Sequence, residues 1–294
     1  MKRIGFIGLG SIGAPMARCI VRAGYQTVVC DKRPKSLVIF KEMGAIVTEK
    51  VSDCADREVV IVMVADDAQV REVVLGSDGL LNAVDQNRPP MLAVMSTVLP
   101  ETILELAPKC AEKKVCLVDA PVSGFPMRAE QGKLSIMVGG KKEDLDLMLP
   151  VFKVMGENIY HTGELGTGEI TKLVNNIIAI TNIFITAEAI IIGQNYGMSS
   201  RKLVSIMEAS SGRNFATKDW ELGRKFFEIF SENLDMTKTV LALCRKDLQH
   251  SQELGRGVNV ASPLLDQIVG ALNNFSHEEI NERWHSMLSR PGYK

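Results

Sequence analysis

Uninterrupted runs of apolar residues recur through the first part of the chain, each about the length of a β-strand, and stretches with helical periodicity separate them. Strands that are apolar throughout, rather than at every second position, are typical of a mainly parallel sheet covered on both faces. We expect strands at residues 2–7, 26–30, 58–64, 91–95, 115–119, 134–138 and 158–161, an extended piece at 45–48, and helices from the glycines at 8–13 to about 23 and at 34–43, 67–75, 100–113 and 143–155.

The strand pattern stops after about Gly163, and the rest of the chain predicts helices. The first of them, at about 167–196, has no proline, and past its first turn its only glycine is Gly193; it would reach about 45 Å. Thr167 is its expected N-cap, and Glu169 suits the positive end of a helix. Further helices are expected at 199–210, 217–230, 237–254, 263–274 and 278–288. The chain therefore divides into an α/β domain (1–163) and an all-α domain (164–294), with a ligand cleft expected between them.

Composition narrows the class of protein. Lys and Arg number 34 and Asp and Glu 35, so the net charge of −1 supplies no field that would recruit nucleic acid. The six cysteines are scattered and form no pattern with histidine, so neither disulfides nor a metal site is predicted. The apolar stretch 177–192 is interrupted by Asn182 and Glu188, which favours a buried helix over a membrane span. With a strand expected at the very start, no signal peptide is predicted, and we expect a cytoplasmic protein.

A glycine fingerprint lies between the first strand and the first helix. Glycines at this point let the backbone approach a pyrophosphate, whose charge then meets the helix N-terminus. Asp31 ends the second strand, 18 residues after Gly13, close to the usual interval for an acid that binds the ribose diol. The context predicts a Rossmann-type doubly wound sheet whose cofactor contacts are Gly8, Leu9, Gly10, Ser11, Ile12, Gly13 and Asp31.

The choice between NAD and NADP depends on the charges beside Asp31. Its carboxylate would repel a 2′-phosphate and so favours NAD. Lys32 and Arg33 could partly offset that repulsion, or they could be solvated loop charges. We expect NAD, and these two residues leave the use of NADP open.

Polar residues gather near the start of the long helix. Lys172, Asn175 and Asn176 lie at i, i+3 and i+4, so they share one face. On an otherwise apolar helix such a group is costly unless it is exposed, paired or functional. A solvated helix start is the simpler interpretation, and the residues alone do not choose between the two. Elsewhere, Ser123 and Gly124 follow a strand that ends at Asp119, where a hydroxyl and backbone N–H groups could bind a carboxylate.

Together these motifs resemble the β-hydroxyacid dehydrogenase family over essentially the whole chain. The matching segments are 8–17 (GLGSIGAPMA), Ser96-Thr97 followed by Pro100, 119–124 (DAPVSG), 166–176 with its two glycines, lysine and two asparagines, 210–213 (SSGR) and 246–248 (KDL). The resemblance implies an NAD(P)-dependent oxidoreductase that acts on a small β-hydroxy acid or its semialdehyde, and homodimers or homotetramers.

The resemblance also implies roles for individual residues. Lys172 would be the catalytic acid/base, and Asn176 would orient the substrate, with Asn175 beside it. Ser123 and Gly124 would hold the substrate carboxylate. The cofactor contacts that it adds are Val64, Ala65, Thr97 and Lys246.

Two departures from the family pattern bear on the substrate. Relatives commonly have a second glycine after Ser-Gly, whereas this chain has Phe125-Pro126-Met127-Arg128, which makes the turn bulkier and stiffer. Arg128 could pair with a second acid group on the substrate or could be a solvated surface arginine. Thr239 stands where relatives often have an aromatic that lines the substrate pocket, so a different or larger substrate is open.

Other functions fit the motifs less well. Imine reductases share the fold but generally lack a lysine at position 172, and 6-phosphogluconate dehydrogenases are much longer. A reductase of glyoxylate or succinate semialdehyde remains an alternative within the family. A non-catalytic dinucleotide sensor predicts loss of the lysine or of the Ser-Gly turn, and both are present.

Overall fold

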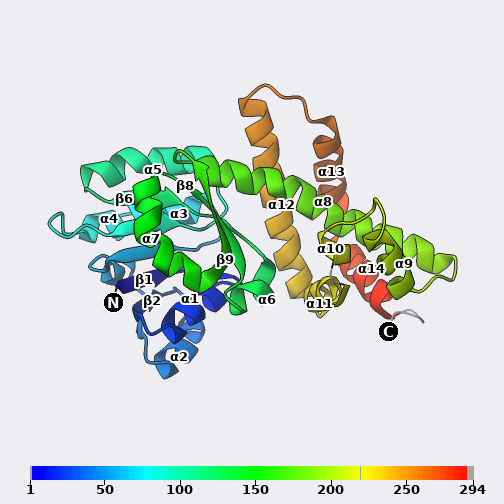
Figure 1. The fold of residues 1–294 in the computed structure, drawn as a ribbon, viewed down its shortest axis with the longest axis horizontal. Helices are drawn as coiled ribbons and strands as arrows, with labels where there is room; N and C mark the ends of the chain where they lie inside the picture. Colours follow the sequence, from blue (N-terminus) through cyan, green and yellow to red (C-terminus); the bar gives the residue numbers. More distant parts are fainter. Residues whose placement is uncertain (1, 219, 290–294) are drawn as a thin grey trace. The chain divides into compact units, whose positions relative to one another are not determined.

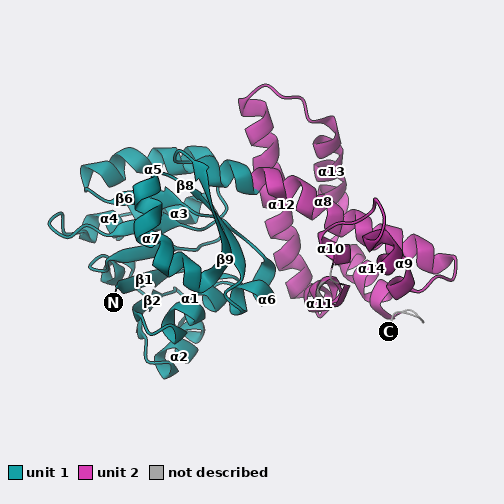
Figure 2. Cartoon of the chain, viewed as in Figure 1, with its two compact units in different colours: residues 1–172 teal, residues 173–294 magenta. Residues whose placement is uncertain are grey.

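The computed structural model describes residues 2–218 and 220–289. The chain folds into two compact units, residues 1–172 and 173–294 (Figure 2). The unit boundary thus falls within the long helix, while the domain boundary at 163/164 stays a prediction.

A nine-stranded sheet forms the centre of the first unit (Figure 1). Its hydrogen-bonded order is β3-β2-β1-β4-β5-β6-β8-β7, and β9 pairs with β8. Strands β1 to β6 run parallel to one another, as the continuous apolar runs predict. The strands are β1 (Arg3–Ile7), β2 (Gln26–Cys30), β3 (Ile46–Thr48), β4 (Val59–Val62), β5 (Met91–Val94), β6 (Cys116–Asp119), β7 (Val122–Ser123), β8 (Leu134–Gly139) and β9 (Gly156–Gly163).

The far edge of this sheet departs from the parallel pattern. Strand β8 runs antiparallel to both β6 and β7, and β9 returns parallel to β8. The sequence did not predict β7, because it contains only two residues, Val122 and Ser123, too few to show a period. It also did not predict the helical segment α6 (Phe125–Glu130), because a Gly-Phe-Pro sequence indicates a turn.

Each face of the sheet packs on its own hydrophobic core. In β4, Val59 and Ile61 belong to one core, and Val60 and Val62 belong to the other. The first core also takes side chains from α1 (Gly13–Arg22), α2 (Pro34–Glu42), α6 and α7 (Lys142–Met155). The second takes them from the short helix η1 (Val51–Cys54), α3 (Asp67–Leu75), α4 (Leu80–Ala83) and α5 (Pro100–Glu112). The sheet is therefore covered on both faces, as expected for a doubly wound fold.

The long helix α8 runs from Thr167 to Asn195. The carboxylate of Asp119, at the end of β6, accepts hydrogen bonds from the backbone N–H groups of Gly166 (2.7 Å) and Glu169 (2.9 Å). The prediction that Thr167 caps this helix is therefore wrong. Its hydroxyl donates to the Glu164 carbonyl, and the cap comes from a distant residue.

The second unit consists of helices, as predicted. After the rest of α8 come α9 (Ser200–Glu208), α10 (Phe215–Lys218), α11 (Trp220–Ser231), α12 (Leu234–Gly257), α13 (Pro263–Asn274) and α14 (His277–Ser289). An aromatic cluster joins α11 and α14: the ring of Trp284 lies 5.5 Å from Phe227 and 5.9 Å from Phe226, in edge-to-face geometry. Both phenylalanines are buried in the core of this helical unit.

Helix α8 is more exposed than the sequence suggested. By length and composition it could cross a membrane, and only 33% of its most apolar window is buried. One such helix is weak evidence for a span, because core helices of soluble proteins satisfy the same criteria. The expectation of a buried helix is correct for one face only. Another face exposes an apolar stripe formed by Val174, Ile178, Ile185 and Ile192.

Candidate active site

The three glycines of the fingerprint differ in what surrounds them. A Cβ atom on Gly8 would lie 2.2 Å from the carbonyl oxygen of Met63, and Gly8 has a φ of +99°. A Cβ on Gly13 would lie 2.1 Å from the carbonyl oxygen of Gly8. A Cβ on Gly10 would meet no atom within 4 Å. Gly8 and Gly13 are thus required by the packing of the turn, whereas Gly10 leaves space where a pyrophosphate could approach.

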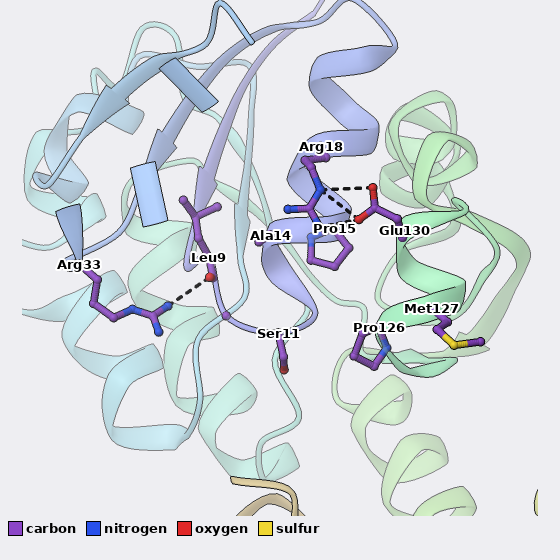
Figure 3. A pocket seen from close by; sticks show the side chains of 10 residues that line it. Leu9, Ser11, Ala14, Pro15, Arg18, Arg33, Pro126, Met127 and Glu130 are labelled. Atoms are coloured by element: carbon purple, nitrogen blue, oxygen red, sulfur yellow. Dashed lines mark hydrogen bonds and ion pairs between the residues drawn. The ribbon is translucent and has the colours of Figure 1, made fainter. Parts of the chain in front are cut away.

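A cavity of about 500 Å³ opens over this glycine turn (Figure 3). One side is formed by the turn and the start of α1, and the opposite side by α6 through Pro126 and Met127. The open space at Gly10 and the N-terminus of α1 fit the phosphates of a dinucleotide. The lining residues are Leu9, Gly10, Ser11, Ala14, Pro15, Arg18, Arg33, Pro126, Met127 and Glu130, while Ile12 packs against the adjoining core.

Ion pairs join the two sides of the cavity. The Arg18 guanidinium binds the Glu130 carboxylate, with Nε 3.0 Å from Oε2, and Nη1 of Arg22 donates to Oε1 at 2.8 Å. Hydrogen bonding to Arg18 holds the pKa of Glu130 below its ordinary value. Glu130 is therefore ionised at neutral pH and fixes α6 against α1.

Asp31 lies beside the glycine turn, as the sequence predicts. Its Oδ2 accepts the N–H of Leu9 at 2.7 Å, and its Oδ1 accepts the N–H of Arg33 at 2.8 Å. The Arg33 side chain contacts both oxygens, with Nε at 3.0 Å and Nη2 at 3.1 Å. Burial alone would raise the pKa of Asp31, but the hydrogen bonds from Arg33 and Leu9 outweigh it and the pKa lies below its ordinary value. Arg33 is therefore an exposed side chain held in an ion pair with Asp31, not an unpaired loop charge.

The predicted cofactor loops after β4 and β5 are tied to each other. The N–H of Val64 donates to the Ser96 hydroxyl at 2.8 Å, and the N–H of Ala65 donates to the Gln69 side chain at 3.2 Å. Thr97 is half-buried in the second loop, and the next residue, Val98, donates its N–H to Glu169 at the start of α8. These bonds fix the two loops and the first turn of α8 as one group.

The predicted carboxylate-binding turn lies at the end of β7. Gly124 has a φ of +144°, and Phe125, with a φ of +59°, occupies the left-handed region that large side chains rarely adopt. Such backbone strain often occurs at functional sites. Arg128 is already engaged, because Nε donates to the Lys133 carbonyl at 2.9 Å and Nη2 lies 3.2 Å from Glu157. A role of Arg128 with substrate would require breaking both contacts.

Helix α8 carries the predicted catalytic group. Lys172 and Asn176 are buried, with exposed fractions of 8% and 6%, whereas Asn175 is exposed and donates to the Asn176 side chain at 3.2 Å. The interpretation of Lys172 as a solvated helix start is therefore wrong. Lys172 is not among the residues that line the cavity over the glycine turn.

Within the second unit, Asn176 is held by a residue that the sequence analysis did not single out. Its Nδ2 donates to Oδ2 of Asp247, on α12, at 2.7 Å. The Lys246 ammonium lies 3.1 Å from the other carboxylate oxygen, near enough for an ion pair although the geometry is not that of a hydrogen bond. Asp247 therefore orients Asn176 and brings it together with Lys246.

Other contributing residues were missed because their signals are weak in one sequence. Arg18 and Glu130 are ordinary helical charges until the fold pairs them across 112 positions. Glu169 was assigned only a helix-dipole role, yet its side chain is fully buried. Over residues 2–218 and 220–289, no group of three or more His, Cys, Asp or Glu could hold a metal ion.

Comparison with known proteins places this site in a family. Residues 3–163 match the model of the NAD binding domain of 6-phosphogluconate dehydrogenase. Residues 166–291 match the model described as NAD-binding of NADP-dependent 3-hydroxyisobutyrate dehydrogenase. The matches leave two positions between them, at the loop before α8.

Relatives and solved structures agree with the family that these two models indicate. A 3-hydroxyisobutyrate dehydrogenase of Pseudomonas aeruginosa is 39% identical over 74% of this chain and 72% of its own length. An NAD-dependent L-serine dehydrogenase of the same organism is 33% identical over 90% of this chain and 89% of its own. The structure of a 3-hydroxyisobutyrate dehydrogenase of Mycobacterium tuberculosis with L-serine has a TM-score of 0.79, 24% identity, and coverage of 98% and 99%, which shows the shared fold. The chain is therefore a member of the β-hydroxyacid dehydrogenase family, oxidoreductases that transfer hydride between a nicotinamide cofactor and a small hydroxy acid.

Proposed function

We propose that the chain oxidises a small β-hydroxy acid, or reduces its semialdehyde, with Lys172 as the general acid/base. The observation that carries this proposal is the burial of Lys172 on a helix whose first turn is anchored by Asp119 and Glu169. A lysine held out of water beside a cofactor-binding sheet has the chemistry that the reaction needs. We assign residues 1–163 to a dinucleotide-binding domain and residues 164–294 to a domain for substrate binding and dimerisation.

In the oxidation direction, Lys172 removes the hydroxyl proton of the substrate. When bound, the nicotinamide supplies the acceptor for the hydride that leaves the same carbon. An ordinary lysine, with a pKa near 10.4, is a poor base at neutral pH, but burial disfavours the charged form of an amine. In the reverse direction, the ammonium of Lys172 returns the proton to the new alkoxide oxygen.

Other residues bind and orient. Ser123 offers a hydroxyl, and the turn at Gly124 offers backbone N–H groups, to the substrate carboxylate. The Asn176 amide, fixed by Asp247, orients the substrate, with Asn175 beside it. Val64, Ala65, Thr97 and Lys246 are assigned to the cofactor, and we assign NAD because Asp31 adjoins the glycine turn.

The test compares Lys172→Met with Lys202→Met, which changes an exposed lysine on α9. We expect Lys172→Met to lower kcat by roughly 10²–10⁴-fold while NADH still binds, as measured by quenching of protein fluorescence, and Lys202→Met to match the parent. Near-normal turnover in Lys172→Met contradicts the role. The substrates to screen, in both directions, are 3-hydroxyisobutyrate, L-serine, 2-(hydroxymethyl)glutarate, glycerate and 4-hydroxybutyrate. Cofactor binding without turnover of any of them would favour a dinucleotide sensor.

We also propose a cytoplasmic homodimer or homotetramer that associates through α8. Ile178, Ile185 and Ile192 recur at seven-residue intervals and are 63%, 54% and 60% exposed, and Val174 adds to the same stripe at 51%. A seven-residue apolar repeat on a helix favours packing against another helix.

The interface proposal has its own measurement. We expect Ile185→Lys to reduce the mass in light scattering, and Val38→Lys, on α2 of the first unit, to leave it unchanged. A parent chain that is monomeric at micromolar concentration overturns the proposal. Vesicle binding abolished by Ile185→Lys would indicate a membrane contact instead.

A further inference from the structure

Glu169 is a buried carboxylate that the proposed reaction does not use. Its side chain is fully buried, and its Oε2 accepts the N–H of Val98 at 3.1 Å. Removing a carboxylate from water is costly unless an opposite charge or several hydrogen bonds offset that cost. A neutral residue could form the same helix, so the charge itself needs an explanation.

The position of Glu169 relative to Lys172 supplies one. The two residues lie at i and i+3 on α8, where side chains are neighbours on one helix face, and both are buried. An opposite charge within a few ångströms favours the charged form of a lysine, which counteracts the effect of burial. Glu169 is therefore placed to set how readily Lys172 gives up its proton.

The surroundings connect this pair to the cofactor loops. Val98, which donates to Glu169, follows Ser96 and Thr97, and Ser96 accepts the N–H of Val64. Two further carboxylates lie nearby within the first unit. Asp119 accepts the N–H of Glu169 itself at 2.9 Å, and Asp67 accepts the N–H of Leu99 at 2.9 Å. Both are occupied with backbone N–H groups of helix starts or loops.

We propose that Glu169 is a positioning residue that fixes the Lys172 turn of α8 to the loop at 96–98 and holds Lys172 as an ammonium until substrate binds. This inference rests on the proposed acid/base role of Lys172. It predicts opposite effects on the two reaction directions, because oxidation requires neutral Lys172 and reduction requires its protonated form.

The decisive variant is Glu169→Gln, whose amide oxygen can still accept the Val98 N–H while the negative charge is lost. In a plot of log kcat/KM against pH, the bend marks the titration of Lys172. We expect this bend to move to lower pH by about one unit, for oxidation and for reduction alike. At pH values below the bend, oxidation by the variant is then up to about tenfold faster than by the parent. At pH values above the bend, reduction by the variant is up to about tenfold slower. Damage to the fold would instead slow both directions at every pH.

Two further variants complete the test. Glu169→Asp keeps the charge on a shorter side chain, so the bend in log kcat/KM should return toward its parental pH even if kcat falls. Glu164→Gln, which removes an exposed carboxylate from the loop before α8, should leave the profile unchanged. A Glu169→Gln enzyme with the bend at its parental pH, or with equal losses in both directions, overturns the proposal. Turnover by Lys172→Met would overturn the underlying acid/base role instead, so the two failures are distinguishable.

Discussion

The start of α8 and the glycine turn, both in the first unit, hold their acidic groups in different ways. At the start of α8, Asp119 and Glu169 are fully buried and bind backbone N–H groups. At the glycine turn, Asp31 binds one backbone N–H of the turn and the side chain of Arg33, which is 63% exposed. The buried acids cannot exchange partners without unfolding the helix start. The Asp31 pair can, because one partner is already in water.

The difference suggests a division of roles. The helix end is fixed before any ligand arrives, which suits a catalytic group that must be placed accurately. The nucleotide end keeps open space at Gly10 and an ion pair that a ribose hydroxyl could share. Substitutions at closed positions, where a side chain is buried against other atoms, should therefore reduce stability. Substitutions at open positions, which adjoin empty space or water, should change ligand binding.

The sharpest test of this contrast compares two glycines of one turn. Gly8→Ala places a Cβ against a backbone carbonyl at a positive φ, so we expect the free energy of unfolding to fall by at least about 3 kcal/mol. Gly10→Ala meets no atom within 4 Å, so its Tm should match the parent, while the KM for the cofactor rises. Urea and thermal unfolding measure the effect on stability, and steady-state kinetics measures the KM for the cofactor. Equal Tm values for both variants would remove the distinction between closed and open glycines.

An intermediate effect is expected at the helix end. In Asp119→Asn, only one side-chain oxygen remains for two N–H groups, so we expect a loss of about 1–3 kcal/mol in the free energy of unfolding. Burial raises the pKa of Asp119 above its ordinary value, although the hydrogen bonds from Gly166 and Glu169 lower it. The neutral side chain therefore recovers some desolvation free energy, which keeps the loss moderate.

The control for this variant is Asp66→Asn. Asp66 caps α3 from a half-buried position by accepting the N–H of Gln69 at 2.8 Å, and asparagine caps helices about as well as aspartate. Its midpoint in urea should stay close to that of the parent. An Asp119→Asn protein as stable as Asp66→Asn would show that the cap of α8 is dispensable.

The sequence predicted most of the fold because the information was local. Continuous apolar runs marked the parallel strands, and the glycine spacing placed the turn at Gly8 and the acid at Asp31. The cap of α8 was mispredicted as Thr167 because the real cap, Asp119, lies 47 residues before the N–H that it binds. No local pattern signals such a contact.

Partners at the site were harder to predict than the residues themselves. Lys172 and Asn176 were identified by spacing and resemblance, but their burial and the bond from Asn176 to Asp247 depend on the folded chain. Arg33 was left between two interpretations for the same reason. Its pairing with Asp31 is local, but its contact with the Leu9 carbonyl, 24 positions away, exists only once β2 lies beside β1.

The smallest effect is expected from Arg33→Ala, which tests the open end. The exposed guanidinium is the group that could meet a 2′-phosphate, so the KM for NADP should rise by up to about tenfold while that for NAD changes less. A variant in which both KM values rise equally would mean that Arg33 only positions Asp31.

The same variant makes a prediction about acid stability. Because the pKa of Asp31 is lowered in the folded chain, its contribution is present above the ordinary pKa of 3.8 and is lost as the pH falls further. Without Arg33 the folded pKa rises toward the ordinary value, so less of that contribution remains at any pH. The urea midpoint of Arg33→Ala, compared with that of the parent, should be slightly lower at pH 6 and should converge with it as the pH falls through the lowered pKa of Asp31. If Arg33 bound to something other than the Asp31 carboxylate, the plots of urea midpoint against pH for the variant and the parent would stay parallel throughout.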